Sequence, residues 1–230
     1  MILGNGARQV KVMNIHKVYG VFQKYFREKR MLWFEEHFKV SDASRILDVG
    51  GGQYNWQFLS HKPSIRVMNI VKPANWDDRL SQFQFEVGDG MDINYPDRSF
   101  DIVYSNSVIE HLGDWESQKL FAKEILRVGK SVYVQTPAKE FLVEPHLLTP
   151  FIHWLPLRWQ ARLLRNFSLW GVITRPSREY VDMFLFERRL LSFREFKELF
   201  KGCEIIHEKV SVFTKSHIAV KHSNENCFRT

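Results

Sequence analysis

The sequence predicts an α/β fold: a Rossmann-like, mostly parallel sheet with one reversed strand near its C-terminal edge and a helical lid insertion. Three observations predict it. Short apolar runs alternate with segments long enough for crossover helices, as in parallel sheets. One run breaks into three glycines in "RILDVGGGQYNW", residues 45–56. A stretch rich in Trp, Leu, Phe and Arg, residues 138–190, interrupts the alternation and is expected to rise above the carboxyl ends of the strands.

The parallel part of the sheet is expected where apolar runs have the length of strands. These runs are residues 45–49, 65–71, 83–87, 100–105 and 131–136. The helix expected between the fourth and fifth of these runs is the best defined of the crossover helices. Phe121 and Ile125 recur there at helical spacing, and Gly129 follows as a stop signal.

The C-terminal part has a different pattern. A short helix is expected at residues 193–200, followed by strands at 203–210 and 216–221. Residues 212–215, which connect these two strands, are too few for a right-handed crossover. The last two strands should therefore pair antiparallel, so that the sheet ends in a reversed strand.

The chain is expected to divide into three segments. Residues 1–40 form an N-terminal helical segment, because apolar side chains recur at helical spacing over residues 14–37. This helix should lie across the domain or beside the mouth of its site. Residues 41–222 form the α/β domain with its lid, and the polar residues 223–230 form a flexible tail.

Composition narrows the class of protein. The 230 residues, 44% of them hydrophobic, are enough for one core with an insertion. Cys203 and Cys227 lie far apart and no charged-then-apolar leader is present, so we expect a reducing cytoplasm and no disulfide framework. No run reaches the roughly 18–20 apolar residues that cross a bilayer, which leaves peripheral membrane contact open. The net charge of +7 favours anionic partners without selecting one.

The three glycines raise the question of which nucleotide they bind. In the dinucleotide pattern Gly-x-Gly-x-x-Gly the third glycine would fall on Asn55, so the fit to a nicotinamide cofactor is poor. Asp48 precedes the glycines, and a carboxylate there suits a cation better than a pyrophosphate. S-adenosylmethionine carries an ammonium and a sulfonium, and a bare main chain lets it approach without Cβ clashes. We therefore expect a cofactor cradle of Asp48, Gly50, Gly51 and Gly52. A tight turn with a capping acid is the alternative.

The ends of the next strands carry compatible residues. Asp89, in "GDGMDI", can accept a hydrogen bond from the adenine amino group, while Gly90 and Met91 can line the base. Ser105 and Asn106, at the end of the fourth strand, would close the floor under the methyl group. Each loop alone is also explained by turn chemistry. Together, at one edge of a parallel sheet, they indicate one ligand.

By these motifs the sequence resembles class I S-adenosylmethionine-dependent methyltransferases, and more closely their type 11 group. The resemblance covers residues 45–221 and lies in "ILDVGGGQYNW", "VGDGMDINYPDRSFDIVYSNSVIEHL" and "EILRVGKSVYVQTP". It implies S-adenosylmethionine as the cofactor and methyl transfer as the reaction. The stretch "EPHLLTPFIHWLP", together with residues 213–216, resembles members found with carbohydrate or envelope biosynthesis. That implies a small-molecule or glycan acceptor, which can be anionic or lipid-linked.

Two positions depart from the family pattern. The usual third glycine of the first loop is Tyr54 here, which implies a looser or differently aimed turn. The usual acid at the end of the second strand, which binds both ribose hydroxyls, is Asn69. An amide can still bind a diol, at a cost of roughly 1 kcal/mol in lost charge assistance.

The segment after the fourth strand carries the candidate catalytic residues. Methyl transfer is an in-line displacement, and a hydroxyl or amine acceptor must also lose a proton. His111 is expected to be the general base, with Glu110 as its orienter or as an acceptor-binding group. The alternative is that His111 caps the following helix or packs beneath the cofactor. Adjacent helical positions point about 100° apart, so the two side chains are not expected to act on the same atom.

The lid carries the residues expected to contact the acceptor. These are Glu144, His146 and His153. The alternative is a buried structural role, in which Glu144 and His146 anchor the lid by hydrogen bonds. Their spacing lacks the i, i+4 pairing of dedicated zinc sites, so no metal is expected.

A basic helix face follows these residues in the lid. Arg158, Arg162 and Arg165 lie three and four positions apart and share one face. Such a face can lie on an anionic membrane or grip the phosphate of a lipid-linked glycan. A solvated basic edge on an amphipathic lid helix is the plainer alternative.

Two other functions compete with methyl transfer to a small-molecule or glycan acceptor. A catalytically silent binding module would keep the fold and dock a partner through its aromatic lid. Nucleic-acid methylation is disfavoured, because residues 105–108 read Ser-Asn-Ser-Val and lack the Asn/Asp-Pro-Pro-aromatic turn that holds a flipped base. No pattern in the sequence indicates an oligomeric state.

Overall fold

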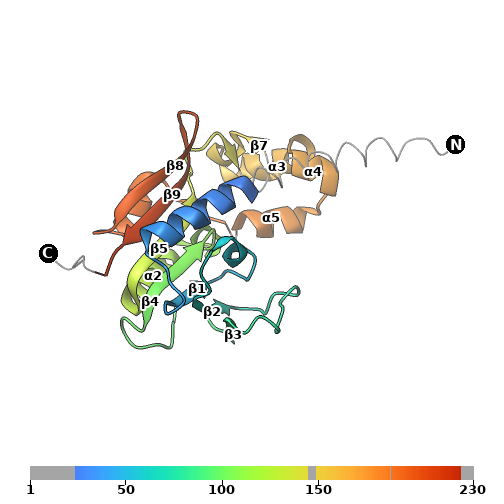
Figure 1. Ribbon diagram of the computed structural model, residues 1–230. Helices are drawn as coiled ribbons and strands as arrows, with labels where there is room; N and C mark the ends of the chain where they lie inside the picture. Colours follow the sequence, from blue (N-terminus) through green and yellow to red (C-terminus); the bar gives the residue numbers. More distant parts are fainter. Residues whose placement is uncertain (1–23, 145–148, 187, 224–230) are drawn as a thin grey trace.

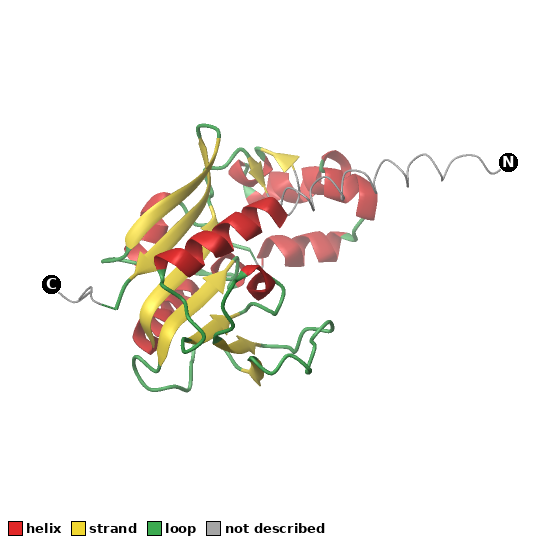
Figure 2. Cartoon of the chain, viewed as in Figure 1, coloured by secondary structure: helices red, strands yellow, loops and turns green. Residues whose placement is uncertain are grey.

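A computed structural model describes residues 24–144, 149–186 and 188–223 of the chain (Figures 1 and 2). Its centre is a seven-stranded sheet in the order β3-β2-β1-β4-β5-β9-β8. The strands are β1 (Arg45–Val49), β2 (Ser64–Asn69), β3 (Phe83–Val87), β4 (Phe100–Asn106), β5 (Gly129–Pro137), β8 (Glu204–Val210) and β9 (Phe213–Lys221). All seven expected strands are present, and β1 and β3 have the predicted bounds.

The topology confirms the predicted fold class. Strands β3, β2, β1, β4 and β5 are parallel, and β9 pairs antiparallel with both β5 and β8. The reversed strand is β9, the last strand of the chain, and it lies near the edge as expected, between β5 and the edge strand β8. The connection from β8 to β9 is shorter than expected: Val210 and Phe213 pair across a turn in which Ser211 has a φ of 56°. Residues 213–215 therefore extend the strand.

The crossover connections contain less helix than the sequence predicts. Only the connection from β4 to β5 holds a full α-helix among the parallel strands, α2 (Trp115–Val128), and Gly129 caps it as expected. The connection from β1 to β2 holds one 3₁₀ turn, η1 (Asn55–Phe58), and residues 70–82 between β2 and β3 hold no helix. Residues 70–82 contain Pro73 together with Asn and Asp residues that favour turns. Within this segment the Trp76 N–H donates to Pro73 O at 3.1 Å.

Apolar side chains bury both faces of the sheet because successive strand residues point to opposite sides. Leu47 and Val49 of β1 pack in one core with α2 and with α6 (Phe193–Leu199). Ile46 belongs to the other core, together with Met31 and Phe34 from a helix at residues 24–37. That helix, blue in Figure 1, lies across the sheet as expected. Residues 14–23 of the predicted helix lie outside the described residues, as does most of the predicted tail.

The lid follows the carboxyl end of β5 and forms a separate helical layer beyond that end of the sheet (Figure 1). It consists of β6 (Val143–Glu144), β7 (Thr149–Pro150), η3 (Ile152–Trp154), α3 (Leu157–Phe167), α4 (Leu169–Thr174) and α5 (Arg178–Phe186). Ile152, Leu164 and Val181 form a small core of its own. Of the helices in the described part of the chain, none is long and apolar enough to cross a bilayer.

Candidate active site

The glycine loop after β1 is closed on its inner side and open on its outer side. Gly50 has a φ of +78°, and a Cβ there would lie 2.6 Å from a methyl carbon of Val108. A Cβ on Gly51 would lie 2.2 Å from both carboxylate oxygens of Asp48. A Cβ on Gly52 would have no atom within 4 Å. Two of the glycines are therefore required by packing, and the third borders open space into which a ligand can approach the bare main chain.

Asp48 supports this loop from below. Its side chain is completely buried, and the indole Nε1–H of Trp56 donates to Oδ2 at 2.8 Å. Within the described residues, Oδ1 accepts no hydrogen bond. Burial raises the pKa of the Asp48 carboxyl to about 7, an effect that Trp56 and the nearby main chain of Gly52 partly oppose. The sequence predicted a carboxylate facing the pocket, but here the carboxylate lies directly under Gly51. Its contact with a ligand ammonium stays a prediction.

Asn69, at the end of β2, ties two strand ends together. Its Oδ1 accepts from the Ile70 N–H at 2.8 Å, and its Nδ2 donates to Gly51 O at 3.4 Å. The amide at the predicted ribose position therefore lies beside the glycine loop and holds it. No local pattern in the sequence indicates this second contact, which spans 18 residues.

The loop after β3 packs against the same region. A Cβ on Gly90 would lie 2.7 Å from the Phe121 ring and 2.8 Å from Val49, so glycine is required at this position. Asp89 is exposed, and its Oδ1 accepts from the Met91 N–H at 2.8 Å. The predicted adenine contacts of these residues stay predictions. The structure shows only that this loop reaches the end of β1.

Ser105 and Asn106, at the end of β4, have different surroundings. Ser105 is buried and its hydroxyl donates to Val49 O at 3.0 Å, which links β4 to the start of the glycine loop. Asn106 Oδ1 accepts from Arg30, which also pairs with Glu208 at 3.0 Å. Arg30 comes from the helix at residues 24–37 and Glu208 from β8, so three distant segments meet at this strand end. No sequence pattern indicates Arg30, Glu208 or Trp56 as part of this site, because their contacts depend on the tertiary fold.

The candidate catalytic pair lies on a 3₁₀ turn after β4, η2 (Ile109–His111). Glu110 is completely buried and its Oε2 accepts from the Thr136 hydroxyl at 3.0 Å. His111 is exposed on 38% of its side chain, and its Nε2 lies 4.0 Å from Glu110 Oε1. The two side chains therefore approach each other, although they are adjacent in sequence. The alternative that His111 caps the following helix is wrong, because Asp114 caps α2 by accepting from the Ser117 N–H at 2.8 Å.

The predicted acceptor residues of the lid are only partly described. His153 Nε2 donates to Lys139 O at 3.0 Å, and the Trp154 indole donates to the same carbonyl at 2.8 Å. His153 thus joins the start of the lid to η3, and its predicted contact with the acceptor stays a prediction. Glu144 ends β6, but its side chain lies outside the described part, as does all of His146.

Comparison with known proteins supports this interpretation of the sheet edge. Residues 47–132 match a family model described as a methyltransferase domain. A phosphoethanolamine N-methyltransferase from Plasmodium falciparum (isolate 3D7) is 32% identical over 95 residues, which are 37% of this chain and 35% of that protein. An ajmaline N-methyltransferase from Rauvolfia serpentina is 47% identical over 51 residues, which are 22% of this chain and 16% of that protein. The matches thus span about a third or less of these relatives.

Two solved structures share the fold over nearly the whole chain. The PH0226 protein from Pyrococcus horikoshii OT3 has a TM-score of 0.52 at 15% identity, covering 86% of this chain and 89% of that one. The Burkholderia thailandensis 1,6-didemethyltoxoflavin-N1-methyltransferase, solved with bound S-adenosylhomocysteine, has a TM-score of 0.53 at 10% identity, covering 96% and 91%. Residues 47–132 are thus similar to a methyltransferase domain, and the whole sheet has the fold of the two solved structures.

Proposed function

We propose that the protein binds S-adenosylmethionine over the glycine loop and transfers its methyl group to a small-molecule acceptor in the cytoplasm. The observation that carries the proposal is the asymmetry of this loop. Gly50 and Gly51 have no room for a side chain on their inner side, whereas Gly52 borders open space. A turn that served folding alone would not need a bare main chain beside open space, whereas a ligand held by main-chain groups does.

The residues present fit this cofactor. The orphaned Oδ1 of Asp48, the Asn69 amide and the exposed Asp89 carboxylate lie at the ends of adjacent strands or just beyond them and offer acceptors for an ammonium, a ribose and an adenine amino group. When bound, S-adenosylmethionine would supply the electrophilic methyl group. The protein's own contribution is to hold the acceptor in line and exclude water, which can account for about 7–11 kcal/mol of a barrier.

His111 is our candidate for the group that removes the acceptor's proton. It is partly exposed and stands 4.0 Å from the buried carboxylate of Glu110, which can favour its protonated form during transfer. Thr136 holds that carboxylate from the other side at 3.0 Å. Since the two relatives named above are N-methyltransferases of small molecules, an amine is the acceptor class to test first. Hydroxylated glycans are the second class.

Cofactor binding is tested by calorimetry with S-adenosylhomocysteine on the wild type and on Asn69→Asp and Asn69→Ala. Asn69→Asp restores the acid of the family pattern and keeps the Oδ1 acceptor for Ile70, so we expect about fivefold tighter binding. Asn69→Ala should weaken binding. Absence of saturable binding in all three proteins would overturn the proposal and favour a binding module with this fold.

The acceptor is tested with methyl-labelled cofactor and panels of amines and hydroxylated glycans. We expect transfer to at least one amine. His111→Gln should then lower kcat about a hundredfold while leaving the affinity for S-adenosylhomocysteine unchanged. Equal kcat values in wild type and variant would remove His111 from the mechanism and leave the methyl-transfer function standing.

A further inference from the structure

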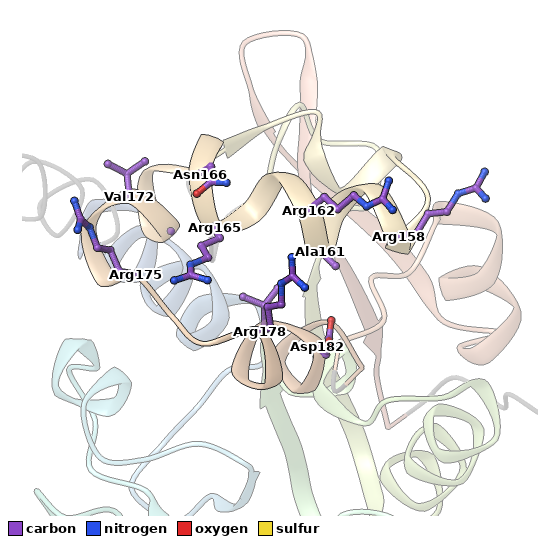
Figure 3. Close-up of a pocket in the computed structure, with 11 residues that line it drawn as sticks. Arg158, Ala161, Arg162, Arg165, Asn166, Val172, Arg175, Arg178 and Asp182 are labelled. Atoms are coloured by element: carbon purple, nitrogen blue, oxygen red, sulfur yellow. The ribbon is translucent and has the colours of Figure 1, made fainter.

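The lid contains a cavity of about 670 Å³ that the glycine loop does not line. Its walls come from α3, α4 and α5 (Figure 3). Five guanidinium groups and one carboxylate line it, a net charge of +4; they belong to Arg158, Arg162, Arg165, Arg175, Arg178 and Asp182. In Figure 3, Arg165 and Arg178 lie toward the middle, with Arg158 at one end and Arg175 at the other. The sequence indicated only the three arginines of α3.

The protein offsets the positive charges of this arginine cavity only in part: Asp182 lies in the lining, and the Glu179 carboxyl interacts electrostatically with Arg178 and Arg165. Within the described residues, no ion pair joins any of the five guanidinium groups to a carboxylate. This contrasts with Arg30, Arg66, Arg79, Arg127 and Arg189, each of which pairs with Asp or Glu. Like charges gathered around one cavity repel one another, and a bound anion would relieve that repulsion.

The frame that carries these arginines is built by specific contacts. A Cβ on Gly171 would lie 1.9 Å from Leu164 O, so α3 and α4 approach as closely as glycine allows. Ser168 caps α4 by accepting from the Gly171 N–H at 2.7 Å. Leu164 and Val181 lie buried in the core of the lid, and Val181 also lines the cavity. The sharp turn between α3 and α4 therefore places their arginines around one space before any ligand arrives.

Arg175 reaches the cavity from a strained backbone. It caps the C-terminal end of α4 with φ 46° and ψ 55°, the left-handed region in which Gly or Asn is usual. A side chain other than glycine there costs stability, and such outliers persist where the side chain has a use. The position adds the cavity's fifth guanidinium.

We propose that this cavity binds a phosphate-bearing small molecule through the arginines of α3, α4 and α5. The planar fork of a guanidinium matches two phosphate oxygens, and several forks around one concave space match a diphosphate or two phosphates on one molecule. Asn166 supplies a neutral donor in the same lining. One step of this proposal rests on the proposed function: the phosphate-bearing ligand is the methyl acceptor, and the lid holds its phosphate end.

The test is calorimetry with inorganic pyrophosphate as probe, on the wild type and on the double variant R165Q/R178Q. We expect saturable binding that weakens about tenfold for each guanidinium lost, hence about a hundredfold. R165K/R178K keeps the positive charge but lacks the planar guanidinium fork, so its pyrophosphate binding should weaken less than that of R165Q/R178Q. R194Q, an exposed arginine on α6 outside the cavity, should bind like the wild type. Circular dichroism establishes that every variant is folded.

Two further measurements distinguish a failure of this cavity from a failure of cofactor binding, and small-molecule binding from membrane binding. Affinity for S-adenosylhomocysteine should be unchanged in R165Q/R178Q, so a failure of cofactor binding and a failure of this cavity give different results. Vesicles of phosphatidylcholine with 30% phosphatidylglycerol present the same phosphate chemistry as lipid headgroups. Binding to vesicles without binding to pyrophosphate overturns the proposal. So does an absence of pyrophosphate binding, or an equal loss of binding in R194Q.

Discussion

The glycine loop and the arginine cavity both concentrate polar groups beyond the carboxyl ends of the strands, but the charged group of the loop is buried whereas those of the cavity are exposed. At the glycine loop one carboxylate is fully buried, and burial raises the pKa of Asp48 to about 7. In the lid, five guanidinium groups stay exposed around an open cavity. The loop is held by a dense set of contacts, whereas the arginines are held through the frame of the helices that carry them.

This difference separates two ways of building a binding site. Main-chain groups at the loop are pre-organised, because Gly50, Gly51 and Gly90 have no room for any side chain. Long arginine side chains keep rotamer freedom until a ligand orders them, and they can adapt to ligands of different shape. We therefore expect the loop to be intolerant of substitution and to recognise one cofactor. The lid should tolerate substitution and tune the acceptor.

The largest effect is expected from Gly51→Ala, with Gly52→Ala as its matched control. The added methyl group at Gly51 would lie 2.2 Å from the Asp48 oxygens, while at Gly52 it would meet nothing within 4 Å. Gly51→Ala should lower the free energy of unfolding by about 4 kcal/mol or more, and Gly52→Ala should change it by less than about 1 kcal/mol.

Urea denaturation measures both variants. Gly52→Ala should nevertheless weaken S-adenosylhomocysteine binding, since its methyl group enters the space assigned to the ligand. Equal loss of stability in the two variants would contradict the contrast between a packed and an open side of the loop.

The next effect is the pH dependence removed by Asp48→Asn. The pKa of Asp48 is raised from 3.8 to about 7, so the folded state binds more protons than the unfolded state between these values. Stability from this group is thus present at low pH and lost as pH rises through about 7. The amide keeps an acceptor for Trp56 but does not titrate. The free energy of unfolding of the wild type minus that of the variant should therefore fall by roughly 2–4 kcal/mol between pH 4.5 and 8.

Urea denaturation of both proteins at several pH values measures that difference, in which the other titrating groups cancel. A pH-independent difference would mean that Asp48 is ionised in the folded protein, and hence that water or a counter-charge reaches it.

The sequence is informative about the glycine loop because its determinants are local. The run from Arg45 to Trp56 contains the strand, the acid and all three glycines, so pattern alone places them at a sheet edge. The pattern does not show which way the Asp48 side chain points. The Asp48 carboxylate lies under Gly51 because the Trp56 indole holds it there, and that contact depends on how η1 folds back.

The lid was harder to predict because its site depends on how three helices pack. Arg158, Arg162 and Arg165 share a helix face by periodicity, so the basic face was predictable. Arg175 and Arg178 join them only because Gly171 lets α4 turn sharply against α3 and Val181 docks α5. The same limit applies to Arg30, whose partners Asn106 and Glu208 lie 76 and 178 residues away.

A smaller effect, confined to the lid, is expected from Gly171→Ala. Its methyl group would lie 1.9 Å from Leu164 O, a main-chain atom, so the turn between α3 and α4 must open. We expect the lid amides to lose about 2 kcal/mol of protection in hydrogen exchange, and pyrophosphate binding to weaken with them. Val172→Ala, an exposed neighbour, should change protection by less than about 0.5 kcal/mol.

S-adenosylhomocysteine affinity is the second measurement on Gly171→Ala, and it should stay within about twofold of the wild type, a difference of under 0.5 kcal/mol. A large loss of cofactor affinity would show that the lid and the loop act as one site.

The smallest effect concerns the strained residue of the arginine cavity. Arg175 has φ 46°, which costs any side chain with a Cβ roughly 1 kcal/mol or more. Arg175→Gly removes that strain, partly offset by glycine's greater freedom in the unfolded chain, so the lid should gain roughly 0.5 kcal/mol. Arg175→Ala removes the same charge and keeps the strain. Hydrogen exchange of α4 and α5 should therefore slow in Arg175→Gly relative to Arg175→Ala, while both bind pyrophosphate equally weakly. If the two variants exchange alike, the left-handed backbone at this position costs nothing, and strain ceases to be a reason for assigning Arg175 to the ligand.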